Sequence, residues 1–140
     1  MTPKQVQLVK RSLGAALLRP DRLAGFFFAE LFARDAGLWR RFRTGIAMRG
    51  SELIDGLCSI VDSIERLHPI VPVLEWLAFQ GARQGIGERQ YQAVAGALVA
   101  ALEAELRDSF TLEHRLAWDA ASRSVIAVMA RALAAEPLAA

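Results

Sequence analysis

The chain has 140 residues, which is enough for one compact domain, residues 1–140, and leaves no room for a second catalytic domain. A net charge of +2 excludes a strongly basic surface of the kind that binds nucleic acid. Apolar residues make up 54% of the chain, yet the longest stretch without a charge, 90–102, is too short to span a membrane, so this hydrophobicity should be buried in a core or against a partner.

Residue types and their spacing predict helices throughout, since Ala, Leu, Arg and Glu dominate and β-branched residues are sparse. The first helix is capped by Thr2, begins at Pro3, has Gln5 to close a capping box and is ended by Pro20. Its predicted inner stripe is Val6, Val9, Leu13 and Leu17. The second helix, 21–34, carries "FFFAELF" with aromatic residues on so many sides that we expect it to be nearly engulfed.

The middle of the chain is predicted to be less regular. Asp35 can cap a short turn, "AGLWRRF", which an irregular corner, "RTGIAMR", follows. A longer helix over 50–67 has an apolar face made by Leu53, Leu57, Ile60, Val61 and Ile64. The pair His68-Pro69 interrupts the pattern, because a residue before proline is pushed out of helical geometry. The next helix, which contains Leu77, should stop near the glycine bend at 85–87.

Two long helices complete the predicted order. The first, 88–106, is rich in small residues, "AVAGALVAAL", and should approach a neighbour closely. The last is capped by Thr111 and runs to about Glu136. The predicted order is therefore two helices, a short turn and a loose corner, two helices, a glycine bend and two long helices.

This order, together with three segments, resembles the globin family, and within it the bacterial single-domain globins and the globin half of flavohaemoglobins. The segments are "FFFAELFARDAGLWRRF", similar to the family's aromatic second helix and corner phenylalanine; "GIGERQYQAVAGALVAAL", similar to its glycine turn and penultimate helix; and "TLEHRLAWDAA", similar to the start of its last helix. The resemblance covers nearly the whole chain and implies an all-α, globin-like fold of about seven helices. It also implies that small residues, Ala24 or Gly25 and Gly50, let the second helix and the long central helix cross tightly.

The same resemblance implies which residues would line a haem pocket. Phe42 matches the corner phenylalanine that packs on haem, Phe28 the distal aromatic position, and Arg49 the place of the distal glutamine or histidine. Tyr91 matches a tyrosine that follows the haem-ligating histidine by ten positions. The implied lining is Phe28, Phe42, Arg49, Leu53, Leu77, Gly81 and Tyr91.

The position that should hold the haem iron has no side chain. Counting back ten residues from Tyr91 gives Gly81, where the family has the proximal histidine whose nitrogen binds iron. The stretch 71–91 contains no histidine, cysteine, methionine or lysine, and the chain's two histidines, His68 and His114, lie elsewhere. We therefore expect no haem, because the ligands that remain are poorer than imidazole: Gln80, Gln84, Met48 or water.

The polar groups around the iron are missing as well. In the flavohaemoglobin-type group a tyrosine and a last-helix glutamate support the ligand histidine. Here the glutamate's place falls near Leu133 or Ala134, and Glu136 is about a turn late. Phe28 stands where a distal tyrosine would donate a hydrogen bond to oxygen, and it cannot donate. Three losses together indicate a lost site rather than one altered ligand.

No other chemistry can be argued from the residues. Two histidines and one cysteine cannot make a tetrahedral zinc site without several carboxylates, and there is no phosphate loop, nucleophile elbow or dinucleotide-binding turn. We therefore expect no catalytic residue, no metal and no enzyme. The lone Cys58 and the lack of an apolar leader favour the cytoplasm. A basic cluster is expected to be hydrated, or otherwise to dock an acidic partner or an anion: Arg40, Arg41, Arg43 and Arg49.

Three functions fit these observations. The favoured one is a haem-free globin-like domain that acts by binding, with its pocket filled by side chains or holding an apolar ligand such as a fatty acid, and with a protein partner or a second copy on its outer helices. The alternatives are a haem protein with unusual ligation, which binds oxygen or nitric oxide, and a structural subunit of a larger complex. The subunit's interface would use exposed apolar residues flanked by arginines, namely Leu38, Trp39 and Phe110.

Overall fold

The computed structural model describes residues 1–44 and 50–135, and for 42–44 and 135 it describes the backbone only. Within these ranges the chain is all-α, with seven α-helices, two short 3-10 helices and no strand. The α-helices are α1 (Pro3–Ala16), α2 (Pro20–Arg34), α3 (Ala36–Thr44), α4 (Gly50–Asp62), α5 (Val71–Arg83), α6 (Glu88–Leu106) and α7 (Leu112–Ala135). The 3-10 helices are His68–Ile70 and Arg107–Ser109.

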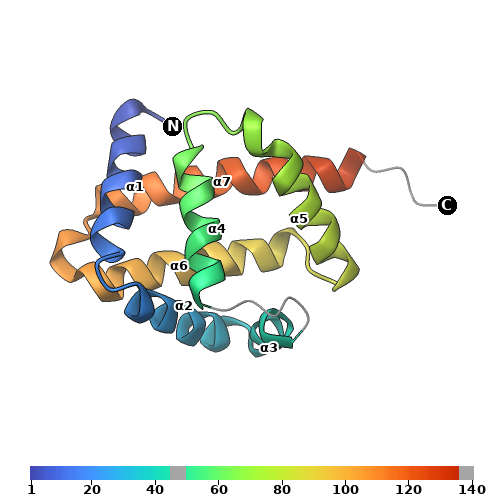
Figure 1. Ribbon diagram of the computed structural model, residues 1–140, viewed down its shortest axis with the longest axis horizontal. Helices are drawn as coiled ribbons and strands as arrows, with labels where there is room; N and C mark the ends of the chain where they lie inside the picture. Colours follow the sequence, from blue (N-terminus) through green and yellow to red (C-terminus); the bar gives the residue numbers. More distant parts are fainter. Residues whose placement is uncertain (45–49, 136–140) are drawn as a thin grey trace.

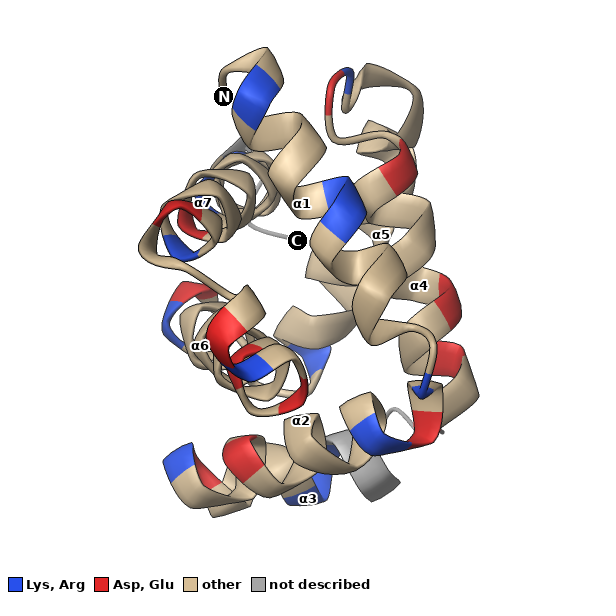
Figure 2. Ribbon diagram, turned by 90° about the vertical axis from the view of Figure 1, so that its left-hand side faces the viewer, with Lys and Arg blue, Asp and Glu red and all other residues tan. Residues whose placement is uncertain are grey.

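The helices form two crossed layers. In Figure 1, α6 and α7 run alongside each other, and Figure 2 places α1, α4 and α5 on the opposite side from them. α2 runs beneath both layers, where it packs mainly on α6 and also contacts α3 and α4. The largest fully buried side chains are Phe27, Leu23, Leu31, Leu38, Leu74, Ile86, Leu102 and Val9. Among the described residues, no helix combines the length and the hydrophobicity that crossing a bilayer requires.

The helix starts follow the predicted capping chemistry. Thr2 Oγ1 accepts a hydrogen bond from the Gln5 amide at 3.1 Å, and Gln5 Oε1 accepts one from the Thr2 amide at 3.0 Å. Asp35 Oδ1 accepts a hydrogen bond from the Leu38 amide at 2.9 Å. The predicted short turn after Asp35 is a nine-residue helix, α3, since this carboxylate satisfies one of its free amides.

Two predicted helix ends are wrong. α1 ends at Ala16, and Pro20 begins α2 rather than ending α1. Proline is favoured at a first helical position because its missing N–H would have no partner there. α4 ends at Asp62 rather than near Leu67. The amides of Ser63 and Ile64 bond to carbonyls three residues earlier, each at 3.1 Å, so the chain tightens into a turn there.

α2 is not engulfed, contrary to the sequence prediction. Phe27 is buried, but Phe26 and Phe28 are half-buried and Phe32 is 51% exposed. Phe32 lies edge-on to Trp39 of α3, with ring centroids 5.2 Å apart. The aromatic residues therefore spread over one face of α2 and its two borders, and the opposite side of the helix is exposed.

α2 and α4 cross at two small residues. A Cβ added to Gly50 would lie 3.2 Å from the Cβ of Ala24, a tight contact, whereas one added to Gly25 would meet nothing within 4 Å. Ala24 is buried and Gly25 is exposed. The close crossing predicted for small residues is confirmed, and Ala24 rather than Gly25 makes it.

One buried hydrogen bond ties α1 to α7. Trp118 Nε1 donates to Ser12 Oγ at 2.9 Å, and Ser12 Oγ donates to the Leu8 carbonyl at 2.6 Å. Both residues are buried, Ser12 at 4% and Trp118 at 2% exposure. The serine hydroxyl therefore completes the hydrogen bonding of an indole that water cannot reach.

We expect Ser12→Ala to lower the free energy of unfolding by about 1 to 2 kcal/mol, because it leaves the Trp118 indole N–H buried without an acceptor. The measurement is urea unfolding followed by circular dichroism. Ser59→Ala is the matched control, since Ser59 Oγ bonds the Asp55 carbonyl at an exposed position. Equal effects of the two substitutions would contradict a structural role for the indole hydrogen bond.

Candidate functional site

Three of the residues predicted to line a pocket meet at the junction of α5 and α6. Gly81 and Leu77 lie on α5, and Tyr91 lies in the first turn of α6. Phe28 of α2 and Leu53 of α4 are half-buried against the large core in which Tyr91 also packs. The side chain of Phe42 and all of Arg49 fall outside the described residues.

The glycine bend after α5 places an apolar side chain beside Gly81. Gly85 has φ +76°, a left-handed conformation that glycine adopts without strain. The Ile86 amide bonds to the Gly81 carbonyl at 2.9 Å and the Gly85 amide to the Ala82 carbonyl at 3.0 Å, which is a Schellman helix end. Ile86 is 2% exposed, and its Cβ would lie 3.5 Å from a Cβ at residue 81. The bend therefore turns Ile86 into the core.

The space in front of Gly81 is filled by the side chain of Tyr91. A Cβ built on Gly81 would overlap the Tyr91 hydroxyl and would lie 3.2 Å from Tyr91 Cζ. Side chains in a helix lean toward its N-terminus, so a tyrosine one turn into α6 leans back over the end of α5. Gly81 itself is buried. The point at which a side chain of residue 81 would begin is thus occupied by a phenol oxygen.

The phenol has a hydrogen-bond partner there. Tyr91 Oη donates to the Leu77 carbonyl at 3.3 Å, which is the carbonyl four residues before Gly81. Burial raises the pKa of the Tyr91 hydroxyl above its ordinary value of 10.0, because the phenolate would be poorly solvated. The hydroxyl is therefore neutral over the physiological pH range and acts as a donor.

Tyr91 also joins two hydrophobic cores. It packs against the large core between the two layers, and against a smaller one made by Leu74, Ala78 and Met129 of α5 and α7. Leu133 belongs to the smaller core, whereas Ala134 is exposed. The resemblance gives residues 133 and 134 as the two candidate positions for the glutamate that supports a ligand histidine. The one that packs on the same small core as Tyr91 is residue 133, which is a leucine.

The titration of Tyr91 can be observed alone, because it is the only tyrosine in the chain. We expect the absorbance change of tyrosinate formation to have its midpoint above pH 10 in the native protein and near 10 in concentrated guanidinium. Since the folded-state pKa is the higher one, the stability linked to this group is complete below pH 10 and is lost as the pH rises through the folded pKa. Identical midpoints in the two states would mean that the phenol is not buried.

The two histidines lie on other segments of the chain. His68 is exposed on the 3-10 helix before α5. His114 Nδ1 accepts a hydrogen bond from the Thr111 amide at 3.1 Å, and its ring stacks on Phe110 at 5.6 Å. Over the described ranges, no group of three or more His, Cys, Asp or Glu side chains is placed to hold a metal ion.

The basic cluster is only partly described. Arg40 and Arg41 are exposed on α3, while the side chain of Arg43 and all of Arg49 lie outside the described residues. Arg41 Nη1 donates to the Gly85 carbonyl at 3.4 Å. This contact brings α3 against the glycine bend.

The apolar interface predicted from Leu38, Trp39 and Phe110 is wrong. Leu38 is 1% and Phe110 8% exposed, and Trp39 is half-buried against Phe32. All three complete the core because α3 and the Arg107–Ser109 turn fold inward. The large exposed apolar residues of the helices are instead Phe32, Val73, Trp76, Leu112 and Leu116, and helical spacing could not separate them from core positions.

Comparisons of the sequence with models of known protein families and with curated proteins give no match. Function is therefore inferred from the side chains around Gly81 and from the surface of the helices.

Proposed function

We propose that this chain is a haem-free, globin-like domain that acts by binding a partner protein. The observation that carries the proposal is the position of the Tyr91 hydroxyl, which lies where the side chain of residue 81 would begin. In the globins that the sequence resembles, that side chain is the iron ligand. Here the ligand is missing and its place is filled by another group of the same chain.

The arrangement of the helices supports the globin-like part of the proposal. Seven helices occur in the order implied by the resemblance, with a close crossing of α2 and α4 at Ala24 and Gly50. The glycine bend leads from α5 directly into the 19-residue α6, and α6 packs beside the 24-residue α7. We infer the equivalence of Gly81 to the proximal position from the resemblance and from the spacing to Tyr91, and this order of helices supports it.

Unusual iron ligation is the weaker alternative. Gln80 and Gln84, which lie next to Gly81 and three residues after it, are exposed, so neither amide is held toward the interior. Met48 lies outside the described residues. The apolar residues that would cover a porphyrin, Phe28, Leu53 and Leu77, pack into the two cores that meet at Tyr91.

The exposed apolar residues support a role in binding. Val73 and Trp76 are neighbours on the outer side of α5, at 56% and 58% exposure, and Leu112 and Leu116 are neighbours on α7, at 68% and 50%. Large exposed aromatic and aliphatic side chains are enriched where proteins meet. A permanent partner would make this domain a subunit of a larger complex. We take it to act in the cytoplasm, in keeping with its single cysteine.

A hemin titration tests the proposal. We expect added hemin to give no sharp low-spin spectrum and no rise in Tm, because a ligand stabilises a fold only when it binds the native state. A histidine-ligated globin stripped of its haem, titrated in parallel, should show both effects. A saturable spectrum at one hemin per chain, with a raised Tm, would overturn the haem-free assignment.

A further inference from the structure

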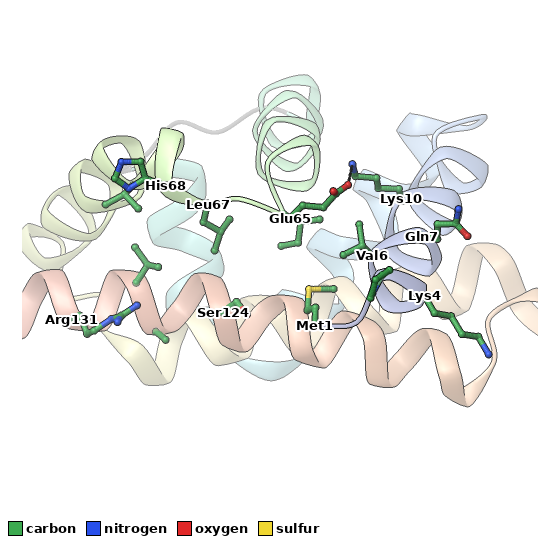
Figure 3. Close-up of a pocket in the computed structure, with 15 residues that line it drawn as sticks. Met1, Lys4, Val6, Gln7, Lys10, Glu65, Leu67, His68, Ser124 and Arg131 are labelled. Carbon is green, nitrogen blue, oxygen red and sulfur yellow. Dashed lines mark hydrogen bonds and ion pairs between the residues drawn. The ribbon is translucent and has the colours of Figure 1, made fainter.

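The structure also contains a groove between three segments of the chain. It has a volume of about 1390 Å³ and runs between the N-terminal half of α1, the segment 64–71 and the C-terminal half of α7, as Figure 3 shows. Neither Gly81 nor Tyr91 lines it. The groove is therefore a feature of the surface rather than the remnant of a haem site.

Two walls of the groove are helical stripes. The α1 stripe is Pro3, Val6, Gln7 and Lys10, with Met1 and Lys4 beside it, and the α7 stripe is Ser124, Ala127, Val128 and Arg131. Both sets follow the spacing i, i+3, i+4 and i+7, which places them on one face of each helix over about two turns, or roughly 10 Å. Two such faces with a space between them form the kind of groove into which a third helix packs.

The floor of the groove is apolar, and the α7 wall carries small side chains. Val6 and Ile64 are buried at its base, and Leu67 and Val71 are half-buried beside them. On the α7 wall, Ser124 and Ala127 are small, so the axis of an incoming helix could approach α7 closely. Because Ala127 and Pro3 are exposed, the groove is open along its length.

The rim of the groove is basic at both ends. In Figure 3, Arg131 and His68 lie at one end, and Lys4 and Lys10 lie toward the other. Three Lys or Arg side chains line the groove against a single acid, Glu65.

The cations of the rim are available to a partner. Lys10 Nζ is 2.8 Å from Glu65 Oε1, and Lys4 Nζ is 3.2 Å from Glu113 Oε2. Both pairs are exposed, so exchanging them for new partners would cost little. Arg131 has no ion-pair partner among the described side chains.

We propose that this groove binds an amphipathic α-helix of a partner protein, with an apolar face flanked by Asp or Glu. The apolar face would cover Val6, Ile64 and Val128, and the flanking acids would meet Arg131 at one end and Lys4 or Lys10 at the other. This inference rests on the proposed function only in that the domain acts by binding. It names the site and the chemical character of the partner.

The chain's own acidic helix does not suit the groove. α4 carries Glu52, Asp55 and Asp62 and no Lys or Arg. Its exposed face is made of these acids with serine and glycine, while its leucines and isoleucines pack into the core. On a second copy of the chain this helix could offer the charge but not the apolar stripe, and we take the partner to be a different protein.

Binding of a synthetic peptide tests the proposal. The probe is a fluorescent helical peptide of about four turns, with Leu at i, i+3, i+4 and i+7 and Glu on both flanks, followed by fluorescence anisotropy at low ionic strength. A peptide with the same leucines and Lys on the flanks is its counterpart. We expect saturable binding of the acidic peptide and at least about tenfold weaker binding of the basic one.

Two pairs of variants locate the binding. Ala127→Trp fills the groove and Arg131→Glu reverses a rim charge, and we expect each to weaken acidic-peptide binding by about tenfold or more. Two control variants make the same chemical changes at exposed positions outside the groove lining. They are Ala29→Trp on α2 and Arg123→Glu on α7, and both should leave peptide binding unchanged. Circular dichroism checks that all four variants are folded.

The proposal is overturned if neither peptide binds, or if Ala127→Trp binds as tightly as the unchanged protein. Saturable binding of monomeric oleate that Ala127→Trp abolishes, without peptide binding, would also overturn it, in favour of a small amphipathic anion. Failure here leaves the haem-free assignment intact, because Gly81 and Tyr91 are outside the groove. A haem spectrum would likewise not contradict the proposal that the groove binds a helix.

Discussion

Gly81→Ala is expected to lower the free energy of unfolding by about 3 kcal/mol, at the upper end of the range for overpacking a core. The added methyl would overlap the Tyr91 hydroxyl and would also contact the Cβ of Ile86 at 3.5 Å. The sign of the effect is informative, because alanine in a helix is normally favoured over glycine by about 1 kcal/mol. Urea unfolding measures the change.

Two controls isolate the contact with Tyr91. Gly56→Ala on α4 should be neutral or stabilising, since a Cβ there meets nothing within 4 Å. In a Tyr91→Phe background the nearest atom would be the ring carbon at 3.2 Å, so Gly81→Ala should then destabilise by about 1 kcal/mol or less. A coupling of about 2 kcal/mol between the two substitutions is expected. Additive effects would mean that the hydroxyl does not occupy this position.

Ile86→Ala should destabilise the fold by about 2 to 5 kcal/mol, the range for truncating a buried isoleucine. Ile86 is 2% exposed and is the residue that the Schellman bend turns inward beside Gly81. Removing it would leave a cavity that neither Gly81, which has no side chain, nor the hydrogen-bonded Tyr91 can fill. The loss should appear in both thermal and urea unfolding.

Val73→Ala is the matched control for Ile86→Ala. Val73 is also β-branched and lies on α5, but it is 56% exposed, so its truncation should change the unfolding free energy by about 0.5 kcal/mol or less. If Ile86→Ala were as mild as Val73→Ala, the bend would not be part of the core, and Gly81 would not be enclosed from that side.

Features with a local chemical cause could be predicted from the sequence. The capping box of Thr2 and Gln5, the Asp35 cap and the bounds of α6 depend on residues within a few positions of one another, and the structure contains all three. Pro20 is predicted to end the first helix but is the first residue of α2. Proline is common both just after a helix and at the first position of one. The pattern of apolar residues alone does not distinguish these two roles.

Features that depend on packing could not be predicted in the same way. The aromatic run of α2 suggested burial on all sides, but which phenylalanines are exposed depends on how α3 and α6 cover the helix. Leu38 and Phe110 looked like surface residues because they sit in short polar segments, and both are buried by the turns that carry them. Helical spacing gives the faces of a helix and not its neighbours.

The sequence predicted the missing side chain of the candidate site, but not what fills its space. Counting ten residues back from Tyr91 identified Gly81 as a position without a side chain. What fills the space depends on the angle between α5 and α6, which the Gly85 conformation and the inward turn of Ile86 determine. Which of Leu133 and Ala134 faces the smaller core depends on how α7 packs, and in the structure it is Leu133.

The most direct test is the visible absorbance spectrum of the protein purified from cells with an ample haem supply. We expect no Soret band, because residue 81, which the proposal equates with the iron ligand, is a glycine, and the Tyr91 hydroxyl lies where its side chain would begin. A Soret band at one haem per chain that stays with the protein through gel filtration would contradict the central claim.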